Sequence, residues 1–339
     1  MTRHRRLRLR RMGWGIGLTT FLLLAGILGL CIGEVWLSPS EVVSALTGGE
    51  APLAEVMIGL RWPRVVGALV VGGCLGLSGG ITQSLLRNPL ASPDIVGVTA
   101  GASMAALLSL LALGSASTFA PGAGSFSVPV LAIVGGSLSG ALVVLMAWRA
   151  GLEPRRVVLV GLGVNAGLTA LTSWLLLRAD LPELSGALIW LAGSLSAVDP
   201  KILQPALGAT VVFVILAALS ARQLSLLRFG ERTVRSLGVN VPLAQLFQAG
   251  LAVAAASVAC AIAGPVAFVA FCAPPLAMAL FRTEGPPALA GSLVGALMVV
   301  VADIVARTAL PAPVPVGLVT SFCGAPALLW ILTRRRASA

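Results

Sequence analysis

The sequence contains little charge. Only 10% of its 339 residues are Asp, Glu, Lys or Arg, whereas 58% are hydrophobic and the mean hydropathy is +1.00. Soluble globular domains carry about 25% charged residues. A core surrounded by water could not hold this much apolar surface, so the composition excludes an ordinary soluble domain and predicts an all-α polytopic membrane protein.

Residues that carry chemistry are also scarce. The only histidine, His4, lies in a basic N-terminal stretch. An HExxH zinc motif, a pair of aspartates within the apolar segments, a nucleophile with a neighbouring base and a Walker P-loop are all absent from the sequence. The stretch GLGVNAG (161–167) is similar to a dinucleotide-binding loop, but it lies inside an apolar segment with no strand before it. These absences argue against an enzyme.

The five cysteines show no CxxC spacing, and all of them lie in apolar runs (Cys31, Cys74, Cys260, Cys272 and Cys323). Neither a metal site nor a disulfide framework is expected from them, and we interpret them as small packing residues. The 39 glycines, in contrast, are abundant. Small residues spaced four apart allow transmembrane helices to approach closely. Four pairs have this spacing: Gly76/Gly80, Gly97/Gly101, Gly136/Gly140 and Gly163/Gly167.

A membrane span requires about 20 apolar residues. The N-terminus is basic and then apolar like a signal peptide, but its apolar run is too long and no small-x-small cleavage site follows, so we predict an uncleaved first span. Ten spans are predicted, at 13–33, 62–82, 93–113, 127–148, 157–177, 202–221, 244–263, 265–281, 287–309 and 314–333. The eighth is short and contains Pro265, Pro274 and Pro275, which predicts a kinked or broken helix whose neighbours satisfy the freed backbone groups.

The distribution of basic residues predicts the orientation. With the N-terminus in the cytoplasm, ten spans also place the C-terminus there. Eighteen of the 23 basic residues then lie inside, and five lie outside: Arg61, Arg64, Arg178, Lys201 and Arg307. This bias agrees with the positive-inside rule. The high pI therefore reflects membrane topology, and no nucleic-acid partner is expected.

The acidic residue that we place deep within a predicted span is Asp303, and Arg307 follows it at i+4. An internal ion pair and a functional role both fit this spacing. Carriers coupled to an ion gradient usually bury carboxylates or histidines along their path. Since nothing else here would couple transport to a gradient, we expect energy to come from another chain.

One charged stretch interrupts the apolar spans, LSLLRFGERTVRSLGVNVPL (224–243). Glu231 and Arg235 are four apart, a spacing that supports a helix, and Gly238 is a typical helix stop. The predicted orientation places this segment in the cytoplasm. We predict a short amphipathic helix-turn in which Val234 and Leu237 share a face with Phe229. Exposed apolar residues rimmed by charge are typical of a docking site.

Several ordered motifs resemble one family over nearly the whole chain. They include RWPRVVGALVVGGCLGLSGGITQSLLRNPLASPDIVGVTAGAS (61–103), LIWLAGSL (188–195), LRFGERTVRSLGVNV (227–241), AGPVAFVAFCAPPLA (263–277), ADIVARTAL (302–310) and PVPVGLVTSFCGAPALLWIL (313–332). They resemble the FecCD-type permeases of iron-siderophore and vitamin B12 ABC importers, nearest the ferric-enterobactin-type branch. The resemblance implies about ten helices per subunit, a type II ABC importer permease architecture and a bacterial inner-membrane location.

The resemblance also implies partners. Such permeases work in identical or mixed pairs, with two ATPase subunits below and a substrate-binding protein above, so ATP and magnesium are expected on the ATPase and no cofactor is expected on this chain. We therefore predict a basic cytoplasmic tail (1–12), one transmembrane domain (13–333) with a coupling segment at 224–242, and a second tail (334–339). The coupling residues implied by the family pattern are Gly230, Glu231, Arg232, Arg235, Leu237 and Gly238.

Two further groups follow from the resemblance. Arg61, Arg64 and Arg307 match arginines that meet glutamates of the binding protein, although snorkelling to lipid headgroups is an alternative for each. Asn165, Thr169, Thr172 and Ser173 are candidates for the translocation path in the fifth span, although small polar residues also serve helix packing. A large chelate requires a wide, weakly binding route.

One stretch departs from the family pattern. Pro275 stands where the family usually has His, and Met278 where it usually has Arg, in a 273–284 loop expected to face the cytoplasm. The departure fits either a lineage variant or a chain paired with a non-identical permease. The cargo expected from the resemblance is a ferric siderophore, with vitamin B12 or heme as alternatives. A secondary carrier or channel, and a receptor or scaffold, are the alternatives from other classes.

Overall fold

The computed structural model describes residues 3–33, 35–47, 52–113, 127–149, 151–196, 198–309 and 314–336. Within these ranges every regular element is helical, apart from one isolated bridge between Trp148 and Leu152. The long apolar helices are α1 (Arg3–Cys31), α3 (Pro52–Leu85), α4 (Val98–Leu113), α6 (Ser127–Ala147), α7 (Pro154–Leu176), α9 (Pro200–Leu226), α11 (Val241–Ala263), α12 (Val269–Phe281), α13 (Ala288–Thr308) and α14 (Val316–Arg336). Each of the ten predicted spans overlaps one of them.

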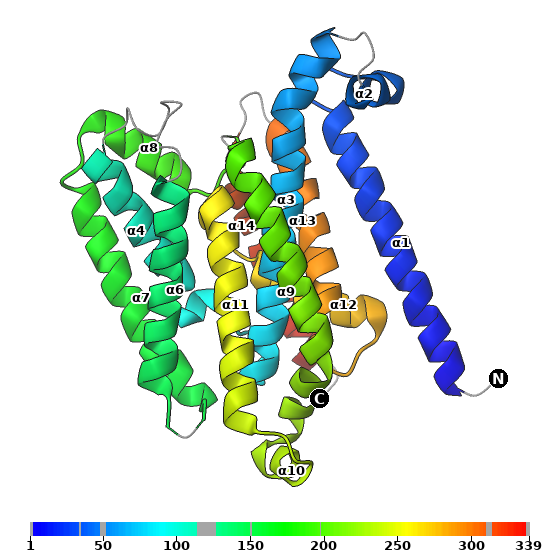
Figure 1. Ribbon diagram of the computed structural model, residues 1–339, viewed down its shortest axis with the longest axis vertical. Helices are drawn as coiled ribbons and strands as arrows, with labels where there is room; N and C mark the ends of the chain where they lie inside the picture. Colours follow the sequence, from blue (N-terminus) through cyan, green and yellow to red (C-terminus); the bar gives the residue numbers. More distant parts are fainter. Residues whose placement is uncertain are drawn as a thin grey trace.

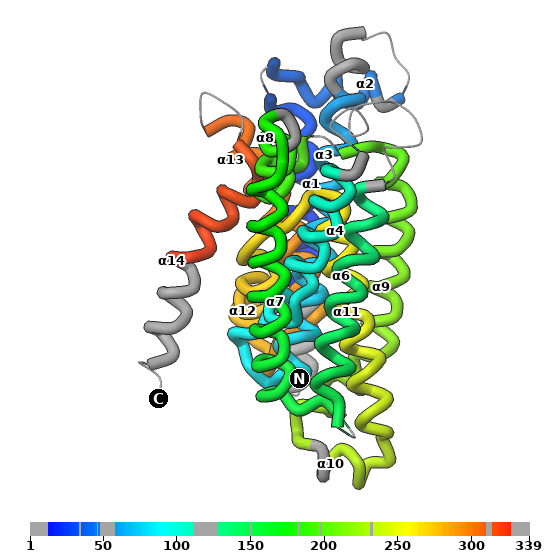
Figure 2. Tube along the Cα trace, turned by 90° about the vertical axis from the view of Figure 1, so that its left-hand side faces the viewer, coloured from blue at the N-terminus to red at the C-terminus, as the bar shows by residue number. Residues whose placement is uncertain are grey.

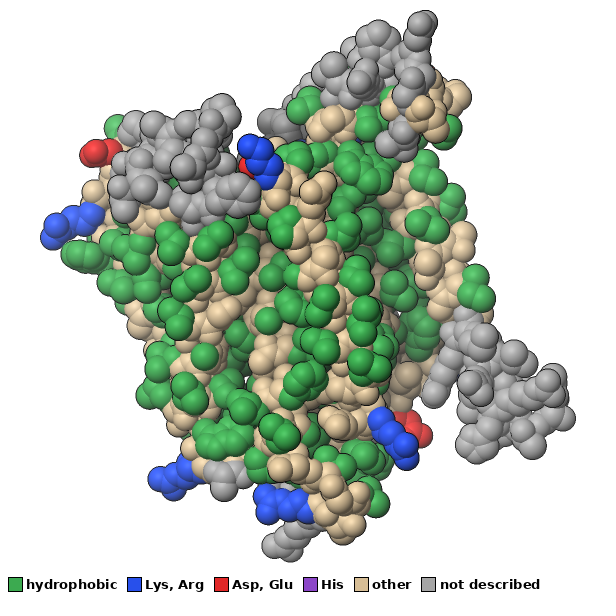
Figure 3. Space-filling model, viewed as in Figure 1, with side chains coloured by type: hydrophobic (Ala, Val, Ile, Leu, Met, Phe, Trp, Pro, Cys, Tyr) green, Lys and Arg blue, Asp and Glu red, His purple; other side chains and the backbone are tan. Residues whose placement is uncertain are grey.

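Seven of these helices are long and apolar enough to cross a membrane by length and composition, and α4, α12 and the described apolar part of α14 are shorter. The helices run roughly parallel, with α2 (Pro39–Leu46) and α8 (Leu181–Leu191) at one end and α10 (Glu231–Ser236) at the other (Figure 1). Hydrophobic side chains cover the middle of the face shown in Figure 3, whereas the described charged side chains on that face lie toward its two ends. This arrangement is the one a bilayer requires.

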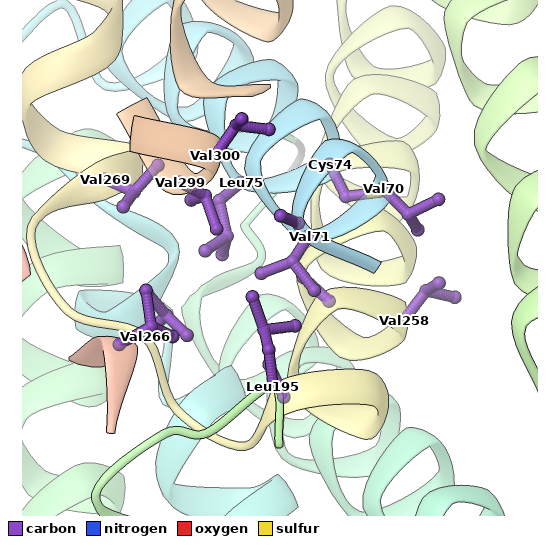
Figure 4. Close-up of a cluster of buried hydrophobic side chains, with 14 of the residues drawn as sticks. Val70, Val71, Cys74, Leu75, Leu195, Val258, Val266, Val269, Val299 and Val300 are labelled. Atoms are coloured by element: carbon purple, nitrogen blue, oxygen red, sulfur yellow. The ribbon is translucent and has the colours of Figure 1, made fainter. Parts of the chain in front are cut away.

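The fold is built around α3. This helix packs along α13, α11 and α12, and it lies inside the bundle in both views (Figures 1 and 2). Figure 4 shows the main core cluster, in which Val71 and Leu75 of α3 lie among Val299 of α13, Val258 of α11 and Val269 of α12. The prediction from glycine spacing is confirmed here, because a Cβ on Gly76 would overlap the carbonyl oxygen of Gly291 on α13.

Of the other three glycine pairs, two pack closely against a neighbouring helix and one does not. Gly97/Gly101 and Gly136/Gly140 also face close neighbours on α6 and α11, so close packing is confirmed for them. In contrast, a Cβ on Gly163 or Gly167 of α7 would meet no atom within 4 Å in this chain. These two glycines lie on an exposed side of α7, and the prediction of a close helix contact is wrong for them within one subunit.

The predicted break at the eighth span is confirmed. After Gly264 (φ +71°) the chain is irregular, and α12 begins only at Val269, with Phe268 at φ +66°. Pro275 lies inside α12 and cannot donate to the carbonyl of Phe271 four residues earlier. That carbonyl instead accepts a hydrogen bond from Nε2 of Gln83 on α3, at 3.0 Å. A neighbouring helix therefore satisfies the backbone group that the proline leaves free.

Three features differ from the predictions. The third span does not begin as an α-helix, because η1 (Pro93–Val96) ends at Gly97 in the left-handed region (φ +79°) before α4 starts. Residues 273–281 are not a loop but the second half of α12, with Ala273 and Ala277 fully buried, so only 282–287 connect α12 to α13. Finally, α2 was not predicted, although Ser38 and Glu41 form a capping box that marks its start.

Candidate functional site

At the α2 and α8 end, the structure brings together the three arginines predicted there. Arg61 and Arg64 lie on α3, and Arg307 lies near the end of α13. The carboxylate of Asp303, one turn before Arg307, is 2.6 Å from Nε of Arg64 and 3.1 Å from Nε of Arg307. The ion pair expected from the i+4 spacing is therefore confirmed, and a second arginine from another helix joins it.

These side chains are largely buried. The side chain of Asp303 is 2% exposed, that of Arg307 8% and that of Arg64 16%. Removing one partner of a buried ion pair typically destabilises a protein by about 3–5 kcal/mol, because the remaining charge stays uncompensated. Two guanidinium groups share this single carboxylate, so the Asp303–Arg64–Arg307 triad keeps one net positive charge.

Arg61 and Arg307 also cap the C-terminal end of α1. The last carbonyls of a helix have no partner within the helix and are favourable sites for cations. Arg61 donates to the carbonyls of Leu30 (2.8 Å) and Cys31 (3.1 Å), and Arg307 donates to those of Gly29 (3.1 Å) and Ile32 (3.2 Å). Arg61 and Arg307 thus hold α1, α3 and α13 together.

At the opposite end, the predicted short helix is present as α10. It follows η2 (Leu227–Phe229) and is bracketed by two glycines in the left-handed region, Gly230 (φ +94°) and Gly238 (φ +77°). L side chains rarely adopt such φ values, and a Cβ at either position would meet nothing within 4 Å. Both glycines are therefore explained by backbone conformation and not by crowding.

The apolar residues of this segment do not share one face, and the prediction for Val234 is wrong. Val234 is 0% exposed and packs with Leu227, Val241 and Ala244. Phe229 and Leu237 are 70% and 60% exposed. A helix this short is stabilised by tertiary contacts, and the buried side chain of Val234 provides such a contact. Arg235 is exposed, whereas the side chains of Glu231 and Arg232 lie outside the described residues.

The path candidates all lie on α7, which is one of the least buried long helices of the chain. Thr169 and Ser173 are exposed, Asn165 is half-buried and Thr172 is buried. The hydroxyls of Thr172 and Ser173 donate to the carbonyls of Leu168 (2.8 Å) and Thr169 (3.0 Å) in the same helix. Within one chain Thr169 and Ser173 therefore face outward, Asn165 does so in part, and Thr172 faces the interior.

Sequence reasoning missed Asp94, which is half-buried in η1 between α3 and α4. Its carboxylate accepts hydrogen bonds from the side chains of Ser92 and Thr99. A sequence signal was available, because Pro93 and Asp94 with Gly97 three residues further on are typical of a turn. The carbonyl oxygen of Asp94 also accepts a hydrogen bond from the Gly97 amide at 2.9 Å, so Asp94 stabilises the turn in which Gly97 adopts its positive φ.

The comparison with protein families decides the identity of the fold. The FecCD transport family matches residues 21–334. The chain belongs to the FecCD transport family. This match confirms the resemblance inferred from the ordered motifs. It also agrees with the prediction of a multi-pass membrane protein that belongs to a bacterial transport system.

Full-length relatives agree. The chain is 37% identical over 318 residues to the ferric enterobactin transport system permease protein FepG of Escherichia coli (strain K12), covering 93% of this chain and 94% of that protein. It is 36% identical over 329 residues to the achromobactin transport system permease protein CbrC of Dickeya dadantii (strain 3937), covering 95% and 91%. Both relatives are permease proteins, as expected for a transport subunit.

A solved structure agrees as well. A metal-chelate type ABC transporter in an inward-facing conformation superposes with a TM-score of 0.80 at 27% identity, covering 96% of this chain and 99% of that one. The predicted type II ABC importer permease architecture is therefore confirmed. As a FecCD family member, the chain is a permease subunit of an ABC importer.

Proposed function

We propose that this FecCD permease moves a ferric siderophore across the bacterial cytoplasmic membrane, driven by ATP hydrolysis on partner ATPase subunits. The observation that carries the cargo is the full-length similarity to permeases whose names specify ferric enterobactin and achromobactin transport. Other relatives of 31–34% identity are named for iron(3+)-hydroxamate and Fe(3+) dicitrate transport. Vitamin B12 and heme are the alternative cargoes.

The proposed ATPase contact is the η2–α10 segment, with Gly230, Glu231, Arg232, Arg235, Leu237 and Gly238 as coupling residues. Its exposed Phe229 and Leu237 support this role, since large apolar side chains beside charged ones are typical of interface anchors. In the proposed orientation α10 and both termini face the cytoplasm. ATP and Mg²⁺ bind the partner and not this chain.

The proposed contact with the substrate-binding protein lies at the opposite end. The Asp303–Arg64–Arg307 triad retains one positive charge, and Arg64 is its most exposed member. A glutamate of a binding protein could complete the pairing of Arg64, and electrostatic complementarity of this kind sets register and association rate. Arg61 and Arg307, which cap α1, would support this surface from below.

The proposed path runs between two permease subunits, identical or homologous, along the exposed side of α7. Gly163, Ala166, Gly167 and Ala170 give this side a small-residue surface that allows close approach of a second helix bundle. Asn165, Thr169 and Ser173 then supply sparse polar groups near the interface, and Thr172 supports α7 from its buried side.

Uptake of radiolabelled iron tests this function. Cells lacking their own siderophore permease would receive this chain with the ATPase and binding protein encoded beside it, and ferric enterobactin, ferric citrate, heme or radiolabelled vitamin B12 would be supplied in turn. We expect uptake of a ferric siderophore that stops when the ATPase carries a Walker lysine substitution. Uptake that persists without a functional ATPase would instead support a secondary carrier or channel, and no uptake of any cargo would support a receptor.

A further inference from the structure

Arg228 lies in η2, immediately before α10, and is half-buried. Its side chain reaches two other parts of the chain. Nη2 donates to Oγ of Ser84 on α3 at 3.0 Å and to the carbonyl oxygen of Pro286 in the α12–α13 connection. One guanidinium therefore joins three segments that are more than 50 residues apart in sequence.

The surroundings of Arg228 are built to receive it. Ser84 is 1% exposed and is itself fixed by a hydrogen bond to the carbonyl of Gly80 at 2.8 Å. A Cβ on Gly285 would overlap the guanidinium, so only glycine leaves room for it there. The hydroxyl of Thr283 donates to the carbonyl of Gly285 at 2.9 Å and holds the turn in place.

A second arginine makes the reciprocal contact. Arg87, just after α3, donates from Nε to the carbonyl of Leu227 in η2 at 3.2 Å. Leu85 of α3 packs against the cluster of Leu227 and Val234. The end of α3 and the η2–α10 segment therefore hold each other by two arginines and one apolar contact.

The contacts continue through the membrane-spanning part of the chain. Gly72 and Gly76 of α3 lie against the backbone of Gly295 and Gly291 of α13, with no room for a side chain. At its far end, the contact between α3 and α13 includes the Arg64–Asp303 ion pair, which again joins the two helices. Packed interiors resist continuous deformation, so α3 and α13 form one stiff body from the α12–α13 connection to the outer triad.

We propose that Arg228 is a positioning residue that fastens the η2–α10 segment to the α3–α13 body, so that displacement of α10 by an ATPase moves these two helices. The proposal rests on the proposed function, because it presumes that an ATPase pushes on α10. Energetic coupling between distant sites travels through contiguous packed contacts of this kind when both sites bias them.

The contact is tested first without any partner. Hydrogen exchange of α10 and of residues 282–287 would be measured on the purified full chain as wild type, Arg228→Met, Arg228→Lys and Ser84→Ala. A lysine keeps the charge but lacks the planar fork that serves two acceptors. Arg222→Met, which removes an exposed arginine on α9, is the matched control.

We expect α10 amides to exchange about tenfold faster in Arg228→Met, equivalent to about 1.4 kcal/mol. Arg228→Lys and Ser84→Ala should show smaller increases, and Arg222→Met should match the wild type. Unchanged exchange in both Arg228→Met and Ser84→Ala would overturn the proposed contact. If Arg228→Met does not fold, Ser84→Ala and Arg228→Lys decide the question, since both leave the apolar anchors intact.

Coupling is tested in proteoliposomes with the ATPase, by the ratio of ATP hydrolysed to iron imported. Arg228→Met should import several-fold less iron per ATP hydrolysed than the wild type. An unchanged ratio would overturn the transmission role even if exchange is faster. If the wild-type chain binds no ATPase, the proposed function fails, while the exchange result on the Arg228 contact stands by itself.

Discussion

The two ends of the molecule present different side chains. At the α2 end, Arg61, Arg64 and Arg307 turn inward, where they pair with Asp303 or cap α1. At the α10 end, Arg228 also links segments of the chain, whereas Arg235, Phe229 and Leu237 are exposed. The arginines of the α2 end therefore link helices, and the α10 segment in addition exposes large apolar side chains that we propose for docking. Substitution of the buried side chains should accordingly affect stability, and substitution of Phe229 and Leu237 should affect association.

The largest effect is expected for Asp303→Asn. This change leaves Arg64 and Arg307 buried without their carboxylate and should reduce the free energy of unfolding by about 3–5 kcal/mol. The measurement is the fraction of monodisperse protein recovered from detergent after heating. Asp180→Asn, an exposed N-cap of α8 whose side chain makes no cap hydrogen bond, is the matched control. Equal recovery for the two variants would contradict a structural role for the Asp303–Arg64–Arg307 triad.

A smaller loss is expected for Gly76→Ala, which tests the body that connects the two ends. Alanine normally favours a helix over glycine by about 1 kcal/mol. At position 76 its Cβ would overlap the backbone of Gly291, and overpacking of this kind destabilises by about 1–3 kcal/mol. The same change at Gly163, where nothing lies nearby, should be neutral or stabilising in an isolated subunit. Heat-induced aggregation in detergent compares the two variants, and equal midpoints would argue against a close α3–α13 contact.

Within the η2–α10 segment, Val234 and Leu237 should separate stability from the proposed docking. Val234→Ala removes buried methyl groups and should lower stability by about 1–2 kcal/mol. Leu237→Ala removes an exposed side chain and should leave the isolated chain unchanged within about 0.5 kcal/mol. Unfolding in detergent measures both. A larger loss of stability for Leu237→Ala than for Val234→Ala would mean that Leu237 is the buried side chain and Val234 the exposed one.

The smallest effect concerns Glu41 at the start of α2. The hydrogen bond from the Ser38 hydroxyl lowers the pKa of this carboxyl below its usual value, and the Ser38 backbone amide adds to the shift. A lowered folded-state pKa means that the contribution to helix stability is present above the ordinary glutamate pKa. It is lost as the pH falls through the depressed value. Hydrogen exchange of α2 should therefore accelerate at acidic pH in the wild type more than in Glu41→Gln, and identical pH profiles would rule out the capping role.

Whether a structural feature could be predicted from the sequence depended on how far apart in sequence the interacting residues lie. Spans, the break before α12 and the Asp303–Arg307 pair follow from local spacing, and the structure confirms them. Arg64 joining Asp303, Gly76 meeting Gly291 and Gln83 satisfying Phe271 each connect residues about 190 or more positions apart, and no local pattern specifies such partners. Val234 was misplaced for the same reason, because the direction of a short helix is set by the surface it packs on.

For the proposed coupling site, the sequence predicted the residues but not the contacts that they make. The turn glycines Gly230 and Gly238 and the helix between them could be inferred from the pattern. The role of Arg228 could not, since Ser84 and Pro286 become its neighbours only after α3, α9 and α13 pack. The altered stretch after Ala273 was expected in a loop facing the ATPase. Pro275 and Met278 instead lie in α12 and are half-buried, and residues 282–287 form the connection to α13, in which Arg282 and Glu284 are exposed.

The difference between the two ends is tested most directly by a Phe229→Ser/Leu237→Ser double variant. Copurification of the ATPase and ATP-driven uptake of ferric siderophore would be measured together with thermal stability in detergent. We predict wild-type stability with at least tenfold weaker ATPase association and a matching loss of uptake, since hot-spot residues contribute about 2 kcal/mol or more each. Full uptake and undiminished ATPase association in a folded double variant would contradict the account.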